Sequence, residues 1–149
     1  VRPGQHSLRP ATAEHVGRRY PADPPYVVSR AKIVEFAEAL RDDNPAYRGD
    51  HPVAPPTFAA VIAAQAWGAL FGDDELGLAL NRTMHTDQTF TFRRPLRPDD
   101  AVVAELSLEK VRNRGALDMI TVLVDLTVDG ETVCEARSTL MHTREDDDA

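Results

Sequence analysis

The chain has 149 residues, 42% hydrophobic and 28% charged, which is the size and composition of one globular domain with its own core. Its 17 Lys and Arg against 24 Asp and Glu give a net charge of −7, which argues against nucleic acid and anionic membrane surfaces as partners. The one cysteine, Cys134, excludes an internal disulfide and a cysteine zinc cluster and suits a reducing compartment. With no apolar run of about 18 residues and no visible secretory signal, the sequence indicates a cytoplasmic protein without a membrane span.

The two ends of the chain differ from its middle. Residues 1–16 carry Arg and His without periodicity and are predicted to form a flexible arm. Residues 17–143 are predicted to form one domain, and the charged segment 144–149 a disordered tail. The five histidines are scattered without metal-ligand spacing, and no phosphate loop, nucleophile elbow or dinucleotide fingerprint is visible. We therefore expect no metal and no nicotinamide cofactor.

Helical patterns dominate the first half of this domain. Ser29 is a favourable N-cap, and apolar residues between 33 and 40 recur at the spacing of one helix face. The Asp-Asp-Asn-Pro run at 42–45 is expected to stop this helix, because the residue before a proline avoids helical geometry. Residues 57–71 form a second predicted helix that is apolar on nearly every side, which indicates a buried helix.

The hydrophobic period changes to two beyond about residue 80. Alternating or β-branched segments predict four antiparallel strands, within 89–92, 102–111, 119–128 and 132–142. The dipeptide Asp129-Gly130 is a strong hairpin signal between the last two. A sheet that curls around one apolar helix gives an α+β architecture.

Three segments carry residue types suited to chemistry, and the first lies in the loop between the helices. Asp42 and Asn44 stand there, with Tyr47 five positions after the acid, so polar groups could face a common cleft. The alternative interpretation is a helix end followed by an Asx-Pro turn without any chemical role.

The second segment opens the apolar helix, and the third opens the first long strand. Pro56 has no N–H, so only Thr57 and Phe58 could donate to a carbonyl oxygen or an oxyanion, unless the prolines simply start the helix. His85 and Asp87 are two positions apart, which on a regular strand places both side chains on one side. They form either part of a site or a polar pair on the surface.

In their order and spacing these segments resemble the MaoC-type (R)-specific hydratase/dehydratase family. The chain is similar to its small actinobacterial hot-dog proteins, to the N-terminal half of double-hot-dog enoyl-CoA hydratases, and to the non-catalytic subunit of (3R)-hydroxyacyl-ACP dehydratases. The resemblance begins near Gly17-Arg18-Arg19-Tyr20-Pro21 and extends through residues 26–37, 54–58, 85–88 and 94–100. It implies a hot-dog fold and reversible addition of water to a trans-2-enoyl thioester, carried on CoA or an acyl carrier protein, with no metal or redox cofactor.

The same resemblance implies a defect in the catalytic motif, which reads Asp-x-Asn-Pro-x-His in active members of the family. Asp42, Asn44 and Pro45 match it, but Tyr47 stands where the histidine belongs. A histidine exchanges protons near neutral pH, whereas the ordinary pKa of a tyrosine side chain is about 10. In addition, Pro56 stands where active members begin this helix with Ala-His-Gly. The glycine N–H that polarises the thioester carbonyl in those members is therefore missing here.

The resemblance therefore implies a degenerate subunit that binds the acyl thioester and forms a homo- or heterodimer with another hot-dog protein. The alanines of the central helix either leave room for an acyl chain or allow tight packing on the sheet. The candidate catalytic residues are Asp42, Asn44, Tyr47 and His85, and the candidate substrate-binding residues are Pro56, Thr57, Phe58 and Asp87.

Three other functions stay open at this point. The chain could be a self-sufficient homodimeric (R)-specific enoyl-CoA hydratase in which His85 replaces the missing histidine. It could be an acyl-thioester binding module without turnover, or a thioesterase in which Asp42 or Asp87 activates water, because one fold hosts several chemistries. Arg93, Arg94 and Arg97 could dock an acidic carrier protein, or they could only solubilise the surface.

Overall fold

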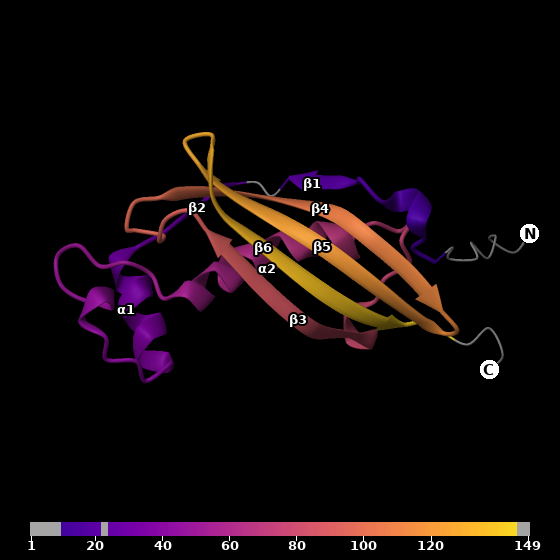
Figure 1. Ribbon diagram of the computed structural model, residues 1–149, viewed down its shortest axis with the longest axis horizontal. Coiled ribbons are helices and arrows are strands. Elements are labelled where there is room, and N and C mark those ends of the chain that lie inside the picture. The colour runs from indigo at the N-terminus through magenta and orange to yellow at the C-terminus, as the bar shows by residue number, and fades with distance from the viewer. Residues whose placement is uncertain (1–9, 22–23, 146–149) are drawn as a thin grey trace, which may run out of the picture.

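The computed structural model describes residues 10–21 and 24–145 and consists of an antiparallel sheet packed on one long helix, α2 (Figure 1). The elements in chain order are η1 (Ala13–His15), β1 (Arg19–Pro21), β2 (Tyr26–Val27), α1 (Arg30–Ala39), η2 (Pro45–Tyr47), η3 (Pro56–Phe58), α2 (Ala59–Phe71), η4 (Leu80–Arg82), β3 (Thr83–Phe92), β4 (Ala101–Arg114), β5 (Leu117–Val128) and β6 (Glu131–Thr143). The strand order is β1-β4-β5-β6-β3, and β2 also pairs with β4. The predicted α+β architecture is confirmed. Among the described residues, no helix has both the length and the apolar character that crossing a membrane would demand.

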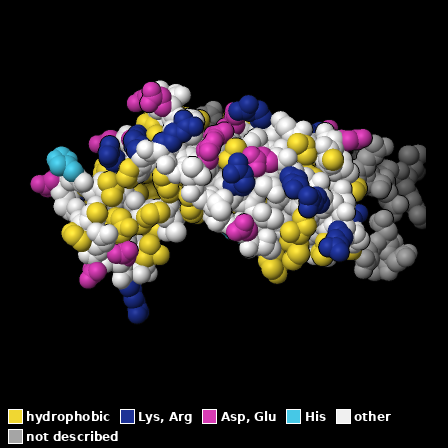
Figure 2. Space-filling model, in the orientation of Figure 1, with side chains coloured by type: hydrophobic (Ala, Val, Ile, Leu, Met, Phe, Trp, Pro, Cys, Tyr) yellow, Lys and Arg dark blue, Asp and Glu magenta, His cyan; other side chains and the backbone are white. Residues whose placement is uncertain are grey.

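The long strands β4, β5 and β6 follow the alternation that their sequences predict. Buried and less buried side chains alternate along each of them, so one face of the sheet forms the core and the other faces outward. Charged side chains of both signs are scattered over the outward face, among uncharged and apolar ones (Figure 2). The fully buried core side chains of these strands are Leu106, Leu108, Ile120, Val122, Val124, Leu126, Cys134, Ala136 and Leu140.

Helix α1 begins as predicted and ends differently. The Ser29 hydroxyl accepts the N–H of Lys32 at 3.1 Å, so the N-cap is confirmed. The helix ends at Ala39, before the Asp-Asn-Pro run, because Arg41 adopts a left-handed φ of 55°. The N–H of Asp42 then donates to the carbonyl of Ala37 at 3.0 Å, which closes a Schellman cap without help from the proline.

Helix α2 is buried on one face only, although its sequence is apolar almost all round. Its core face includes Ala59, Ala63 and Ala66, whose small side chains let the helix lie close to the sheet. The prediction of a helix buried on every side is wrong, since Ala64 and Gly68 are exposed. The physical reason is that the sheet of a single chain covers one side of the helix and leaves the opposite side open.

The N-terminal segment is partly docked, in contrast to the flexible arm predicted for residues 1–16. Ala11 is fully buried, and its N–H donates to the carbonyl of Leu76 at 3.0 Å. The amide of Asn113 bridges the carbonyl of Ala11 at 2.8 Å and the buried carboxylate of Asp118 at 2.6 Å. Residues 1–9 of the predicted arm and 146–149 of the predicted tail lie outside the described residues.

The two edges of the sheet differ in their sequence. At one edge β1 and β2 are short and flanked by prolines, which cannot donate to a further strand. At the other edge β3 has ten residues without a proline, and no strand in the described parts of the chain pairs with its outer side. Leu80 and Met84, near the start of β3, are 67% and 60% exposed.

Candidate active site

The loop after α1 uses its polar side chains to hold its own shape. Oδ1 of Asp42 accepts the N–H of Asn44 at 3.0 Å, and Oδ1 of Asn44 accepts the N–H of Ala46 at 3.0 Å. These are the Asx turns that the alternative interpretation expected. One oxygen of Asp42 stays available in this arrangement, and the residue is half-buried.

Tyr47 ends the short helix η2 and packs partly buried against the core. The loop around it is closed by two backbone bonds, from the N–H of Val53 to the carbonyl of Ala46 at 2.9 Å and from the N–H of Ala54 to that of Leu96 at 2.8 Å. This packing gives the tyrosine a structural contact that a smaller, polar histidine would not reproduce.

The first turn of the central helix lies at the same end of the molecule as this loop. The ring of Phe36 in α1 stands edge-on to the ring of Phe58 at the start of α2, with centroids 5.3 Å apart, and so joins the two elements. The N–H of Phe58 donates to the carbonyl of Pro55 at 2.9 Å. Of the two predicted donors, only the N–H of Thr57 therefore remains for a ligand.

His85 and Asp87 lie on opposite faces of the sheet, so the prediction that they share one side is wrong. His85 is paired with Leu140 and Asp87 with Thr139, which makes Thr86 an extra residue in β3. Such a β-bulge breaks the alternation of side chains. His85 consequently lies on the core-facing side, like Leu140, and Asp87 on the outward side.

The ring of His85 is held by two contacts. It stands edge-on to Trp67 of α2, with ring centroids 5.0 Å apart, and its Nε2 lies 3.0 Å from the carbonyl oxygen of Asp87. Because a carbonyl oxygen can only accept, Nε2 is the donor in this contact. The indole N–H of Trp67 is buried and has no acceptor among the described residues.

The structure separates His85 from the loop that carries Asp42 and Tyr47. His85 is the third residue of β3, and β3 runs from the far end of the sheet toward the end where α1 lies (Figure 1). The strand continues for seven residues beyond His85, to Phe92, which places the histidine about 23 Å from that end of β3. Within one chain, therefore, the acid and this histidine do not form a pair.

The arginines proposed for carrier docking have unequal roles. Arg94 makes a bidentate pair with Asp100, at 2.8 and 3.0 Å, and the bond and charge of Asp100 raise the pKa of the guanidinium. This pair shapes the turn between β3 and β4. Arg93 and Arg97 are exposed and remain available on the surface. In the described part of the chain no three His, Cys, Asp or Glu side chains are grouped to hold a metal ion.

Comparisons with known proteins give one consistent picture. The family model of the FAS1-like dehydratase domain region matches residues 14–136. A UPF0336 protein of Cutibacterium acnes is 51% identical over 139 residues, which cover 93% of this chain and 98% of the relative. A chain of the HadBC (3R-hydroxyacyl-ACP dehydratase) complex from Mycobacterium tuberculosis has a TM-score of 0.77 and 28% identity, over 85% of this chain and 96% of that one. A MaoC-like dehydratase has a TM-score of 0.78 and 27% identity, over 87% of this chain and 42% of that longer one.

Proposed function

The chain belongs to the family of FAS1-like dehydratase regions and has the hot-dog fold of MaoC-like dehydratases, and from this premise we propose that it is the supporting subunit of a heteromeric enzyme. The reaction is dehydration of an (R)-3-hydroxyacyl thioester and its reverse, hydration of an enoyl thioester. This chain contributes acyl-thioester binding, and a second hot-dog protein supplies the Asp/His pair. The reaction uses neither a metal nor a redox cofactor.

The observation that carries the proposal is that, among the described residues, the carboxylate of Asp42 accepts a hydrogen bond from the backbone N–H of Asn44 and makes no hydrogen bond or ion pair with a titratable side chain. Reversible hydration needs one group that takes a proton and returns it, a role suited to a histidine near neutral pH. Tyr47 occupies the position of that histidine and packs against the core. His85, the alternative, lies on the core-facing side of β3 near its far end.

The start of α2 supports the same conclusion. Hydration of an enoyl thioester builds negative charge on the carbonyl oxygen, which active sites stabilise with N–H donors. Pro56 has no N–H, and the N–H of Phe58 is bonded to Pro55. One donor, at Thr57, suits the binding of a thioester carbonyl better than the stabilisation of a developing oxyanion.

The free edge of β3 suits the proposed partner. A second hot-dog subunit that pairs with β3 would join two sheets into one and cover the exposed Leu80 and Met84. The HadBC structure, 28% identical to this chain, is described as a complex, which supports a heteromeric assembly here.

The test is a mutational comparison in a reconstituted complex. The chain is co-expressed with a hot-dog protein whose loop has the intact Asp-x-Asn-Pro-x-His motif, and enoyl-CoA hydration is followed. The proposal expects Asp42→Asn in this chain to change kcat by less than about twofold, and the same change in the partner's motif to lower it about 100-fold or more. A large loss from Asp42→Asn would overturn the supporting role.

A second candidate is a homodimeric enzyme whose site is completed across the β3 edge. Antiparallel pairing of two copies along β3 places the start of one strand beside the end of the other. The His85 end of one copy then lies toward the α1 end of its partner, where Asp42 is found. This geometry favours the alternative in which His85 replaces the missing histidine.

Complementation tests this second candidate. Asp42→Asn and His85→Ala should each abolish turnover by the pure chain. An equal mixture of the two variants, refolded together, should recover about a quarter of the parent activity, because half of the dimers then contain one intact site. No recovery on mixing, or no turnover by the parent, would exclude a shared site.

A further inference from the structure

The sulfur atoms of this chain differ in their access to solvent. There are four, in Cys134 and in three methionines, and all of them lie in described strands. Cys134 is fully buried, and burial together with the charge of Glu135 raises the pKa of its thiol to about 11. Because peroxides attack accessible thiolates, this thiol is protected from them. Reactivity toward peroxide therefore rests with the methionines.

The three methionines form one row on the outward face of the sheet. Met84 in β3 is directly opposite Met141 in β6, which is directly opposite Met119 in β5. Met119 and Met141 have a strand on each side and are half-buried, whereas Met84 lies on the edge strand and is 60% exposed. Oxidation of methionine follows the exposure of its sulfur. Met84 is therefore the sulfur that a peroxide reaches first.

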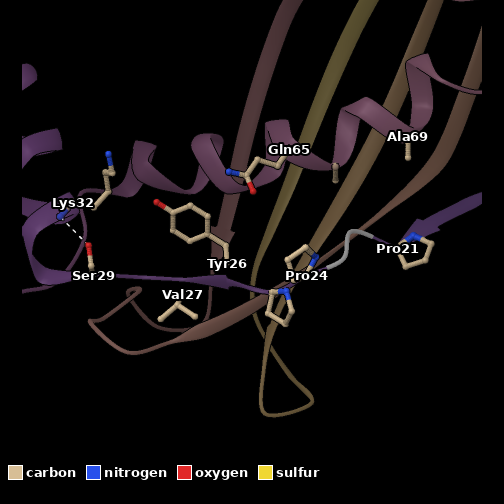
Figure 3. Close-up of a pocket in the computed structure, with 10 residues that line it drawn as sticks. Pro21, Pro24, Tyr26, Val27, Ser29, Lys32, Gln65 and Ala69 are labelled. Carbon is tan, nitrogen blue, oxygen red and sulfur yellow. Dashed lines mark hydrogen bonds between the residues drawn. The ribbon is translucent and has the colours of Figure 1, made fainter.

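The position of Met84 couples its oxidation to strand pairing. Pro21 and Pro24 lie along the opposite edge of the sheet (Figure 3), so a further strand is favoured at β3, which has no proline. Such a strand would give Met84 the neighbours on both sides that Met141 already has. The Met84 side chain would then lose contact with water, which costs a polar sulfoxide more than an apolar thioether. Oxidation and pairing therefore oppose each other.

We propose that Met84 is a reversible oxidation site that controls assembly at the β3 edge. A lone pair of the Met84 sulfur attacks one oxygen of hydrogen peroxide, the O–O bond breaks, and an S–O bond forms. The sulfur loses two electrons, and the departing hydroxide takes the proton of the transferred oxygen and leaves as water. Methionine sulfoxide reductases return the sulfoxide to the thioether. This inference rests on the β3 pairing in the proposed function and does not depend on catalysis by the complex.

The first measurement is a time course of hydrogen peroxide treatment of the pure full chain, followed by mass spectrometry of its peptides. Met84 should be oxidised at least about threefold faster than Met119 and Met141. When the hot-dog partner of the hydration assay is added in excess, oxidation of Met84 should slow to about the rate of Met141. Equal rates for the three methionines in the pure chain would overturn the proposal.

Sedimentation velocity with the same partner measures what the oxidation does. The dissociation constant should rise at least about threefold after peroxide treatment, and methionine sulfoxide reductases with a thiol reductant should restore it. Met84→Leu has an apolar side chain of similar volume without sulfur, so its constant should be the same before and after peroxide. Met119→Leu is the matched control and should respond to peroxide as the parent does.

Two results of the sedimentation experiment would contradict the proposal. One is a parent whose dissociation constant peroxide does not change, and the other is a Met84→Leu variant that responds like the parent. Failure of the hydration assay alone would reject the proposed catalysis and leave this inference standing, because assembly is measured without turnover.

Discussion

At the scale of single residues, Asp73 joins the first strand of the sheet to the end of α2. Its Oδ2 accepts Arg18 at 2.6 Å and the hydroxyl of Tyr20 at 2.5 Å. Burial alone would raise the pKa of Asp73, but these bonds outweigh it and hold that pKa below its ordinary value. Burial and the bond to Asp73 raise the pKa of Tyr20 to about 12. Folding therefore favours the ionised carboxylate.

Replacing Asp73 by Asn should lower the free energy of unfolding at pH 7 by about 1–3 kcal/mol, because the partly buried Tyr20 hydroxyl and the Arg18 guanidinium lose a charged acceptor. Since the folded-state pKa is lowered, this contribution is present above the ordinary aspartate pKa and is lost as pH falls through the folded value. Urea unfolding of parent and variant from pH 7 to pH 3 measures it. Glu75→Gln, at a carboxylate that is 69% exposed, is the control and should cost less than about 1 kcal/mol.

Tyr47 is the residue whose replacement tests the catalytic defect. Tyr47→His should leave turnover by the pure chain at least about 100-fold below that of an enzyme with an intact motif, because Pro56 and Phe58 still offer no N–H to the oxyanion. A spectrophotometric hydration assay measures this, with circular dichroism to confirm folding. A gain to the level of an intact enzyme would show that the tyrosine is the sole defect.

At the scale of elements, three acidic residues form a row across the outward face of the sheet. Glu105 in β4 is directly opposite Asp125 in β5, which is directly opposite Glu135 in β6. Burial and the charge of Glu135 raise the pKa of Asp125 above its ordinary value. Like charges that face each other across strands destabilise a sheet.

Asp125→Asn should therefore stabilise the protein at pH 7 by about 0.2–1 kcal/mol. A raised folded-state pKa means that ionisation of Asp125 costs stability as pH rises through it, so the gain should disappear when pH falls below the ordinary range of an aspartate. Thermal melting of parent and variant at pH 7 and pH 3.5 measures the difference. Destabilisation at pH 7 would show that Asp125 makes a favourable contact instead.

The elements were largely predictable because they rest on local chemistry. Periodicity and turn residues located both helices and the four long strands, and Ser29 identified the start of α1. The bulge at Thr86 was not predictable, because it depends on the register with β6 and not on the composition of β3. The left-handed Arg41, which ends α1, carries no glycine or asparagine signal either.

At the scale of the whole molecule, the two edges of the sheet differ in how well a strand of another subunit could pair with them, and β3 is the favoured edge. Prolines near β1 and β2 hinder the pairing of a further strand at the β1/β2 edge. At the opposite edge, β3 offers ten residues to a partner strand. In Figure 2 apolar side chains gather around α1 and again at the lower edge, where β3 begins. An assembly through β3 would bury Leu80 and Met84, which are exposed near the start of that strand.

Met84→Glu should weaken assembly roughly tenfold or more, because it places a charge in an apolar contact at the β3 edge. Sedimentation velocity across a concentration series measures the dissociation constant. Val103→Glu is the matched control, since Val103 is an exposed apolar residue on β4, away from that edge. Equal effects of the two variants would exclude β3 as the interface.

The candidate site was less predictable than the fold. The motif around Asp42 predicts the loop, and the Asx turns found there match one of the two interpretations of that segment. The loss of Phe58 as a donor and the separation of His85 from Asp42 follow from three-dimensional packing, which spacing along the chain does not encode.

The measurement that tests the central claim most directly is a hydration assay with crotonyl-CoA and a longer enoyl-CoA. It is run on the pure chain and again after addition of a hot-dog protein with an intact Asp/His motif. A supporting subunit should show no enoyl-CoA hydration alone and should raise the turnover of its partner. Turnover by the pure chain that Asp42→Asn abolishes would contradict the account, because the chain would then contain a complete site.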